Sequence, residues 1–166
     1  MQMTPDKKKN KLYIVVPCYN EEQVLGETSK RLKIKCENLI QKGQISKDSK
    51  IVFVDDGSKD RTWKMISELH ETDSLFSGVK LSRNRGHQNA LLAGLTMASE
   101  HADMAISMDA DLQDDINAVD QMIEKYYEGC DIVYGVRSAR ETDTFFKRFT
   151  AVSYTHLRAH ETSAHL

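Results

Sequence analysis

Short runs of β-branched and aromatic residues alternate along the chain with longer stretches whose apolar residues recur at helical spacing. The short apolar runs predict strands at residues 12–16, 51–54, 78–81, 104–108 and 131–134. Apolar residues three or four positions apart predict helices over residues 21–42, 60–69, 88–99 and 116–126. Repeated strand–helix units predict an α/β fold, a mostly parallel sheet with helices on both faces. Such sheets bind ligands beyond the carboxyl ends of their strands, so functional side chains are expected there.

Composition and charge narrow the class of protein further. The 166 residues are 40% hydrophobic and 29% charged, which is typical of a single globular domain. The formal net charge of −2 leaves no basic excess, so a nucleic-acid partner is not expected. No apolar run reaches the roughly 18 residues of a membrane span, and no signal peptide is visible, so the 166-residue chain is expected to be soluble. Cys18, Cys36 and Cys130 are odd in number and widely spaced, which predicts reduced thiols.

The C-terminal segment matches a translated sequencing adaptor. Residues 152–162 read VSYTHLRAHET, one translation frame of a transposase adaptor, and such scars are set apart from fold reasoning. We therefore expect a disordered basic N-terminus at residues 1–10, a folded domain at residues 11–151 and a non-native tail at residues 152–166. The folded domain is expected to be truncated at its C-terminus, and the natural protein to be longer.

Polar segments follow the predicted strands. Residues 17–22 (PCYNEE) follow the first strand and residues 55–60 (DDGSKD) follow the second. Carboxylates at such strand ends can accept hydrogen bonds from a nucleotide base or ribose, although each segment alone also fits a turn and a helix cap. Residues 83–89 (RNRGHQN) place cations just before a predicted helix, which suits an anion but also occurs in surface loops.

A pair of acids, Asp109 and Asp111, follows the apolar run at residues 104–108. Residues two apart in extended backbone face the same side, so both carboxylates can converge on one divalent cation. Gln113 would point the same way if the extended path continued. A cation at this place can bridge a diphosphate. The ordinary alternative is a solvated acidic turn, and the buried strand before the acids makes that alternative less favoured.

Four segments, in this order along the chain, resemble the family-2 glycosyltransferases: residues 16–21, 54–60, 81–94 and 108–114. Within that family the chain is similar to the polyprenyl-phosphate glycosyltransferases, the group of bactoprenol glucosyltransferase and dolichyl-phosphate mannose synthase. Residues 134–137 (YGVR) resemble that group's downstream arginine motif. The resemblance covers about residues 11–150 and implies a Rossmann-like GT-A fold. Two departures are Asp115-Ile116, where prolines are common, and Arg85, where an aromatic residue is common.

The resemblance also implies roles for individual residues. The nucleotide sugar would be held by Pro17, Tyr19, Glu21, Asp55, Asp56, Arg83, Asp109, Ala110 and Asp111. Mg²⁺ or Mn²⁺ would be held by Asp109, Asp111 and Gln113. The acceptor phosphate would be contacted by Arg137 and Arg148. Of these residues, Asp109, Asp111 and Arg137 would take part in catalysis.

The implied reaction is the inverting, metal-dependent transfer of a hexose from a nucleoside diphosphate sugar, UDP-glucose or a similar donor, to polyprenyl phosphate for cell-envelope glycosylation. The longer protein would act at the cytoplasmic face of the membrane, with its oligomeric state left open. Two alternatives remain: a fragment that binds nucleotide sugar without activity, and a family-2 transferase that acts on a saccharide acceptor. A dinucleotide-dependent dehydrogenase is not favoured, because no G-x-G-x-x-G follows the first predicted strand.

Overall fold

The computed structural model describes residues 9–111, 113, 115–135 and 151–155. Its elements, in chain order, are β1 (Leu12–Cys18), α1 (Leu25–Gln41), β2 (Lys50–Asp55), α2 (Thr62–Thr72), β3 (Phe76–Lys80), α3 (His87–His101), β4 (Met104–Ser107), α4 (Ala118–Tyr127), β5 (Tyr134–Gly135) and β6 (Ala151–Thr155). The strands form one sheet in the order β3-β2-β1-β4-β6-β5. The order places β1 and β4 side by side although about ninety residues separate them in the sequence.

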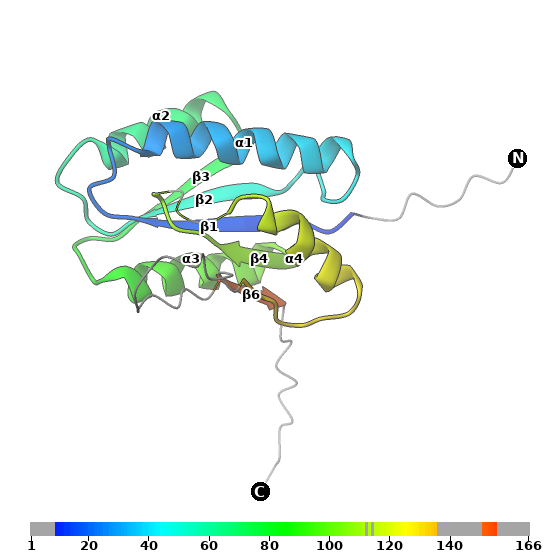
Figure 1. The fold of residues 1–166 in the computed structure, drawn as a ribbon. Coiled ribbons are helices and arrows are strands. Elements are labelled where there is room, and N and C mark those ends of the chain that lie inside the picture. Colours follow the sequence, from blue (N-terminus) through cyan, green and yellow to red (C-terminus); the bar gives the residue numbers. More distant parts are fainter. Residues whose placement is uncertain (1–8, 112, 114, 136–150, 156–166) are drawn as a thin grey trace, which may run out of the picture.

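The first four strands are parallel and set the position of the site. The chain moves outward from β1 through β2 to β3, and then crosses back to place β4 on the other side of β1. In Figure 1, α1 and α2 lie on one face of these strands and α3 lies on the opposite face. The strand order therefore reverses between β1 and β4, whose carboxyl ends lie side by side. This reversal is the topological switch point at which open α/β sheets bind their ligands.

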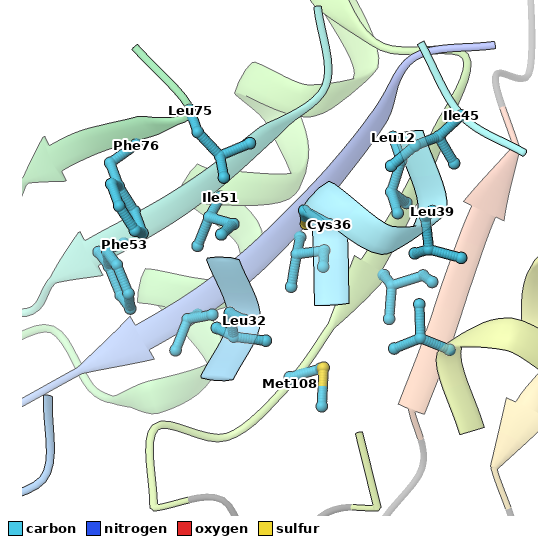
Figure 2. Close-up of a cluster of buried hydrophobic side chains, with 14 of the residues drawn as sticks. Leu12, Leu32, Cys36, Leu39, Ile45, Ile51, Phe53, Leu75, Phe76 and Met108 are labelled. Carbon is cyan, nitrogen blue, oxygen red and sulfur yellow. The ribbon is translucent and has the colours of Figure 1, made fainter. Parts of the chain in front are cut away.

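Alternate positions of β1 pack against different faces of the sheet. Leu12, Ile14 and Val16 belong to a buried cluster that also contains apolar residues of α1, α2 and α4. Figure 2 shows Leu32 and Leu39 of α1 within this cluster. Apolar side chains recur three or four positions apart along α1, so one stripe of the helix is buried against the sheet. This packing fixes α1 over the central strands, and with it the start of the helix beside the end of β1.

The opposite face of the sheet is covered by α3, which approaches closely because its buried positions are small. These positions are Ala90, Gly94 and Ala98. A Cβ atom at Gly94 would clash with Val15 Cγ1 and would lie 2.8 Å from Val54 Cγ2. A larger residue at this position would force the helix away from β1 and β2.

The predicted α/β architecture is confirmed, with two local corrections. The strand predicted at residues 131–134 is wrong, because the ladder begins only at Tyr134 and pairs antiparallel with β6. The place beside β4 in the sheet is occupied by β6. The apolar run at residues 131–133 therefore does not become a strand next to β4. The helix predicted from Glu21 begins at Leu25, because the N–H groups of Val24 and Leu25 both bond the Glu21 carbonyl in a tight turn.

The strand β6 pairs antiparallel with β4, with Met104 opposite Thr155. Residues 152–155 of this strand fall within the segment at 152–166, whose adaptor origin stays a prediction. Across the part of the chain that the structure describes, none of the helices is both long enough and apolar enough to cross a membrane.

Candidate active site

The loops that follow β1 and β2 are pinned to each other by hydrogen bonds between side chains and backbone. The Asn20 N–H donates to Ser58 Oγ at 2.9 Å, and the Glu21 N–H donates to Thr62 Oγ1 at 2.8 Å. In return, the Lys59 N–H donates to Asn20 Oδ1 at 2.8 Å. Asn20 has a φ of 56°, a left-handed conformation that asparagine tolerates better than most residues. The two strand ends therefore form a single rim at the edge of the sheet.

Asp55 is the last residue of β2 and is fully buried. Its Oδ1 accepts the Ser58 N–H at 3.2 Å. Its Oδ2 is buried and has no hydrogen-bond partner among the residues that the structure describes. Burying a polar oxygen without a donor is costly, so such an atom in a folded protein calls for a water or a ligand. A ligand N–H would satisfy this oxygen, which agrees with the nucleotide-binding role that the resemblance implies.

The neighbouring carboxylate, Asp56, holds a different loop. Its Oδ1 accepts the Arg85 N–H at 2.6 Å and its Oδ2 accepts the Gly86 N–H at 2.9 Å. Gly57 allows this approach, because a Cβ there would lie 2.6 Å from the backbone carbonyl carbon of Arg83. Asp56 therefore anchors the loop between β3 and α3, and a contact between its carboxylate and a nucleotide stays a prediction.

The loop that Asp56 anchors leads into the amino end of α3. The helix begins at His87, immediately after Gly86, whose φ of 89° suits glycine. His87 Nε2 lies 3.9 Å from Asp109 Oδ1, at the end of β4. The positive end of the α3 dipole is thus beside the acids after β4, and the exposed Arg83 belongs to the same loop. An anion at this edge of the sheet would find both a helix amino end and basic side chains nearby.

After β4 the chain turns instead of continuing as a strand. The strand ends at Ser107, and Ala110 and Asp111 form a turn. The Gln113 N–H donates to Asp111 Oδ1 at 3.1 Å. The expected extended path through Asp109, Asp111 and Gln113 is therefore wrong, because the Asp111 carboxylate bonds local backbone and bends the chain. What the turn keeps is the position of both acids beyond the carboxyl end of β4.

Acidic side chains from three strand ends share one electrostatic environment. Burial raises the pKa of Glu21, and the negative charges of Asp111, Asp60 and Asp109 raise that pKa further. Two carboxylates and an amide are the hard oxygen ligands that Mg²⁺ and Mn²⁺ prefer, so this set fits a divalent cation. A cluster of three or more His, Cys, Asp or Glu residues suited to a metal is not found in the described ranges. Cation binding by Asp109, Asp111 and Gln113 therefore stays a prediction.

A hydroxyl that no motif singled out reaches this acidic turn. Thr28 Oγ1 on α1 lies 2.5 Å from the carbonyl oxygen of Ala110. The sequence carries a weak signal for it, because Thr28 interrupts the apolar stripe of α1 between Leu25 and Leu32. A buried hydroxyl needs a hydrogen-bond partner, but the pattern does not tell which one. The sequence also indicated no role for His87 on its own, because it was considered only as part of the basic segment at residues 83–89.

The structure brings most of the predicted site residues to one edge of the sheet. These are Pro17, Tyr19, Glu21, Asp55, Asp56, Arg83, Asp109, Ala110 and Asp111, with Gln113 in the adjoining turn. Arg137 and Arg148 lie outside the described residues. A hollow of about 630 Å³ occupies the opposite edge, between Lys11, Asp103 and Tyr126, and none of the predicted site residues lines it.

Comparison with known proteins gives the same family and fold. Residues 13–163 match the family model described as glycosyl transferase family 2. The uncharacterized glycosyltransferase YkoT of Bacillus subtilis is 55% identical over 146 residues, which are 88% of this chain and 43% of that protein. The prophage bactoprenol glucosyl transferase homolog of Escherichia coli is 40% identical over 141 residues, which are 85% of this chain and 44% of that protein. The chain thus spans less than half the length of these curated relatives.

Among solved structures, TarS residues 1–349 of S. aureus superimposes with a TM-score of 0.56 at 17% identity. The superposition covers 82% of this chain and 38% of that one. At this identity the likeness concerns the fold alone, and it agrees with the strand order and the helix placement described above.

Proposed function

This chain belongs to glycosyl transferase family 2, and from that premise we propose that it transfers a hexose from a nucleoside diphosphate sugar to polyprenyl phosphate. The observation that carries the proposal is the gathering of carboxylates beyond the carboxyl ends of β1, β2 and β4. Burial raises the pKa of Glu21 in company with Asp111, Asp60 and Asp109, so these groups lie close enough to repel one another. Such a concentration of negative charge at a ligand-binding edge is expected to be offset by a cation.

The donor is proposed to bind across the rim formed by the loops after β1 and β2. The unpartnered Oδ2 of Asp55 would accept an N–H from the nucleotide base. Tyr19, the residue after β1, is 39% exposed and would offer an aromatic surface for the base or ribose. The diphosphate would then lie toward the amino end of α3, near Arg83 and His87. UDP-glucose or a related UDP-sugar is the proposed donor.

The proposed cation, Mg²⁺ or Mn²⁺, would be held by Asp109, Asp111 and Gln113. It would supply stabilisation of the negative charge that develops on the departing diphosphate. Thr28 Oγ1 lies 2.5 Å from the Ala110 carbonyl oxygen between the two acids, and His87 Nε2 lies 3.9 Å from Asp109 Oδ1. The helix amino end beside the acids adds positive potential for the same leaving group.

The acceptor needs no general base in this proposal. A phosphate monoester has a second pKa near 6, so it is largely a dianion at pH 7 and already nucleophilic. One of its oxygens would attack the anomeric carbon and form the new C–O bond. The bond from that carbon to the nucleoside diphosphate breaks, and the leaving group keeps the electron pair. Attack from the face opposite the leaving group would invert the anomeric centre, as the family resemblance implies. Arg137 and Arg148 are proposed to contact the acceptor phosphate.

The choice of a polyprenyl acceptor is supported by the name of the Escherichia coli relative, a bactoprenol glucosyl transferase homolog. Because that acceptor is a lipid, we propose that the reaction takes place at the membrane, on its cytoplasmic face. The competing proposals are a fragment that binds donor without transfer and a family-2 transferase that uses a saccharide acceptor.

Calorimetric titration of the 166-residue chain with UDP-glucose and with GDP-mannose, each in Mn²⁺ and in EDTA, tests the donor and the cation. We expect UDP-glucose to bind and Mn²⁺ to tighten the binding. In the double variant Asp109→Asn/Asp111→Asn the Mn²⁺ effect should vanish while the melting temperature is kept. Glu124→Gln, which removes one exposed charge on α4, is the control and should behave like the parent. A preference for GDP-mannose, or a Mn²⁺ effect that survives in the double variant, would contradict the proposal.

Transfer is measured separately with UDP-glucose labelled in the sugar. Label that moves to undecaprenyl phosphate in detergent supports the proposed acceptor. Label that moves to a saccharide instead supports the competing transferase. Donor binding without transfer to either acceptor would mean that the 166-residue chain is a binding fragment.

A further inference from the structure

The turn that carries Asp109 and Asp111 is tied to the core of the protein by a buried side chain of α1. Thr28 Oγ1 lies 2.5 Å from the Ala110 carbonyl oxygen, across 82 positions of sequence. The Thr28 side chain is fully buried. The bond therefore links the middle of the acidic turn to a helix that packs across the central strands.

The Thr28 hydroxyl has one proton and two acceptors in reach. The Val24 carbonyl lies at 3.0 Å and the Ala110 carbonyl at 2.5 Å. Val24 already accepts the Thr28 backbone N–H at 3.0 Å, as expected within a helix. The shorter distance to Ala110, and the donor that the Val24 carbonyl already has, favour donation of the hydroxyl proton to Ala110. Thr28 thus makes a tertiary bond as well as the local contact that is usual for threonine in helices.

The Ala110 carbonyl belongs to the peptide unit that joins Ala110 to Asp111. Because that unit is planar, fixing its oxygen also fixes where the Asp111 Cα lies. On the other side, the Met108 N–H donates to the Val15 carbonyl at 3.0 Å and continues the ladder of β4 toward Asp109. The Ala110 methyl group is itself buried in the core cluster. The backbone between the two acids is therefore held at its β4 end, by the buried Ala110 side chain and by the bond to the Ala110 carbonyl.

The acids need such a tether because they repel their neighbours. The pKa of Glu21 is raised by burial and by the charges of Asp111, Asp60 and Asp109. A turn with few fixed points would relieve this repulsion by moving its carboxylates apart. Separated carboxylates would lose the common arrangement that a divalent cation requires.

We propose that Thr28 is a positioning residue that holds the Ala110 peptide and thereby keeps Asp109 and Asp111 in the arrangement that binds the divalent cation. The cation part of this inference rests on the proposed function, whereas the tether itself does not. Thr28 contacts neither substrate nor cation, and it acts only through the backbone of the acidic turn.

Three variants separate this role from general stability. Thr28→Val replaces the hydroxyl by a methyl group of similar shape, and Thr28→Ser keeps the hydroxyl. Ser29→Ala is the matched control, because Ser29 is the next residue of α1, is also buried, and donates its hydroxyl to the Gly26 carbonyl of its own helix, at 2.9 Å. If Thr28→Val does not fold, Thr28→Ala removes the same hydroxyl without adding a methyl group.

Two measurements are made on each variant of the 166-residue chain. The first is UDP affinity by calorimetry in Mn²⁺ and in EDTA. We expect Thr28→Val to reduce the gain in affinity from Mn²⁺ by about tenfold while the affinity in EDTA stays unchanged. Thr28→Ser and Ser29→Ala should keep the parent gain. The second is amide hydrogen exchange, in which Thr28→Val should speed exchange at residues 108–113 but not in the strands.

The outcomes distinguish the tether from the proposed function. If the parent shows no Mn²⁺ gain, the metal part of the proposed function fails, and the exchange measurement still decides whether Thr28 holds the turn. An unchanged exchange rate at residues 108–113 in folded Thr28→Val overturns the tether. Equal losses of affinity in Mn²⁺ and in EDTA, or the same losses in Ser29→Ala, overturn the positioning role and leave Thr28 as an ordinary core residue.

Discussion

Asp55 and Asp56 are neighbours in sequence, yet the structure predicts opposite consequences when each is changed to asparagine. In Asp55→Asn, the amide oxygen can keep the bond from the Ser58 N–H. The amide nitrogen then replaces Oδ2, the buried oxygen for which the described residues provide no donor. The change removes a buried charge without breaking a bond within the described protein, so we expect the free energy of unfolding to be kept or raised. It also turns an acceptor into a donor, so a nucleotide N–H that faces this atom loses its partner.

The size of the expected effect follows from the bond that is lost. A hydrogen bond to a charged group contributes about 1.5–3 kcal/mol. At about 1.4 kcal/mol for each tenfold change, UDP should bind Asp55→Asn roughly tenfold to a hundredfold more weakly.

In Asp56→Asn the expected loss is in the stability of the folded protein. Both carboxylate oxygens accept backbone N–H groups, from Arg85 at 2.6 Å and from Gly86 at 2.9 Å. An amide supplies one acceptor and points its own donor at the second N–H. Both bonds are part-buried, and losing one costs about 0.5–1.5 kcal/mol; each kcal/mol lowers the melting temperature of a domain of this size by about 2–4 °C. We therefore expect Asp56→Asn to melt earlier and to exchange faster in the loop before α3.

Thermal melting and calorimetry with UDP on the same two proteins check both statements. The reasoning would be refuted if folded Asp55→Asn bound UDP as tightly as the parent, because the buried oxygen would then not face the nucleotide. It would also be refuted if Asp55→Asn lost stability while Asp56→Asn kept it, because the two carboxylates would then have exchanged roles.

Three further predictions concern packing, charge and thiol chemistry. Gly94→Ala should lower the free energy of unfolding by about 1–3 kcal/mol in urea denaturation, because its Cβ meets valines of β1 and β2, and an unchanged midpoint would mean that α3 sits farther from the sheet. The pKa of Glu21 is raised in the folded protein by burial and by neighbouring carboxylates, so the native state binds more protons than the unfolded state and stability falls as the pH rises through that titration. Glu21→Gln should therefore raise the melting temperature at neutral pH, with a gain that shrinks as the pH falls through the carboxyl range; a gain independent of pH would contradict this cause. Burial raises the pKa of the Cys36 thiol to about 12 and also raises that of Cys18, whereas Cys130 is exposed, so iodoacetamide should alkylate Cys130 alone before unfolding, as checked by peptide mass spectrometry.

The sequence by itself was sufficient for the architecture of the first four strands. The spacing of apolar residues shows whether a segment is a strand or a helix, because the side-chain period of each depends only on its local backbone geometry. The end of a strand is equally local, so the amino-acid pattern alone locates the polar segments after residues 12–16, 51–54 and 104–108. The four motifs, in their order along the chain, indicated the family, which composition alone does not indicate.

Where the sequence failed, the deciding interaction was one that the hydrophobic pattern does not record. Residues 131–133 have the composition of a strand, but the edge of β4 is paired with β6, so the ladder begins only at Tyr134. The acids after β4 were expected on an extended path. Instead, the Gln113 N–H donates to the Asp111 carboxylate, and this bond bends the path into a turn. Neither the free edge of a sheet nor the competition of a side chain for backbone donors is visible in a hydrophobic pattern.

The different roles of the individual site residues were decided by the tertiary structure alone. In the sequence Asp55 and Asp56 are an equivalent pair, and only the position of the loop at residues 83–86 makes one a loop anchor and leaves the other with a buried oxygen to satisfy. Thr28 is one polar residue on an apolar helix face until packing brings Ala110 to its hydroxyl. Periodicity and strand ends are properties of a few consecutive residues, whereas hydrogen bonds across 29 or 82 positions exist only after the sheet and its helices have assembled.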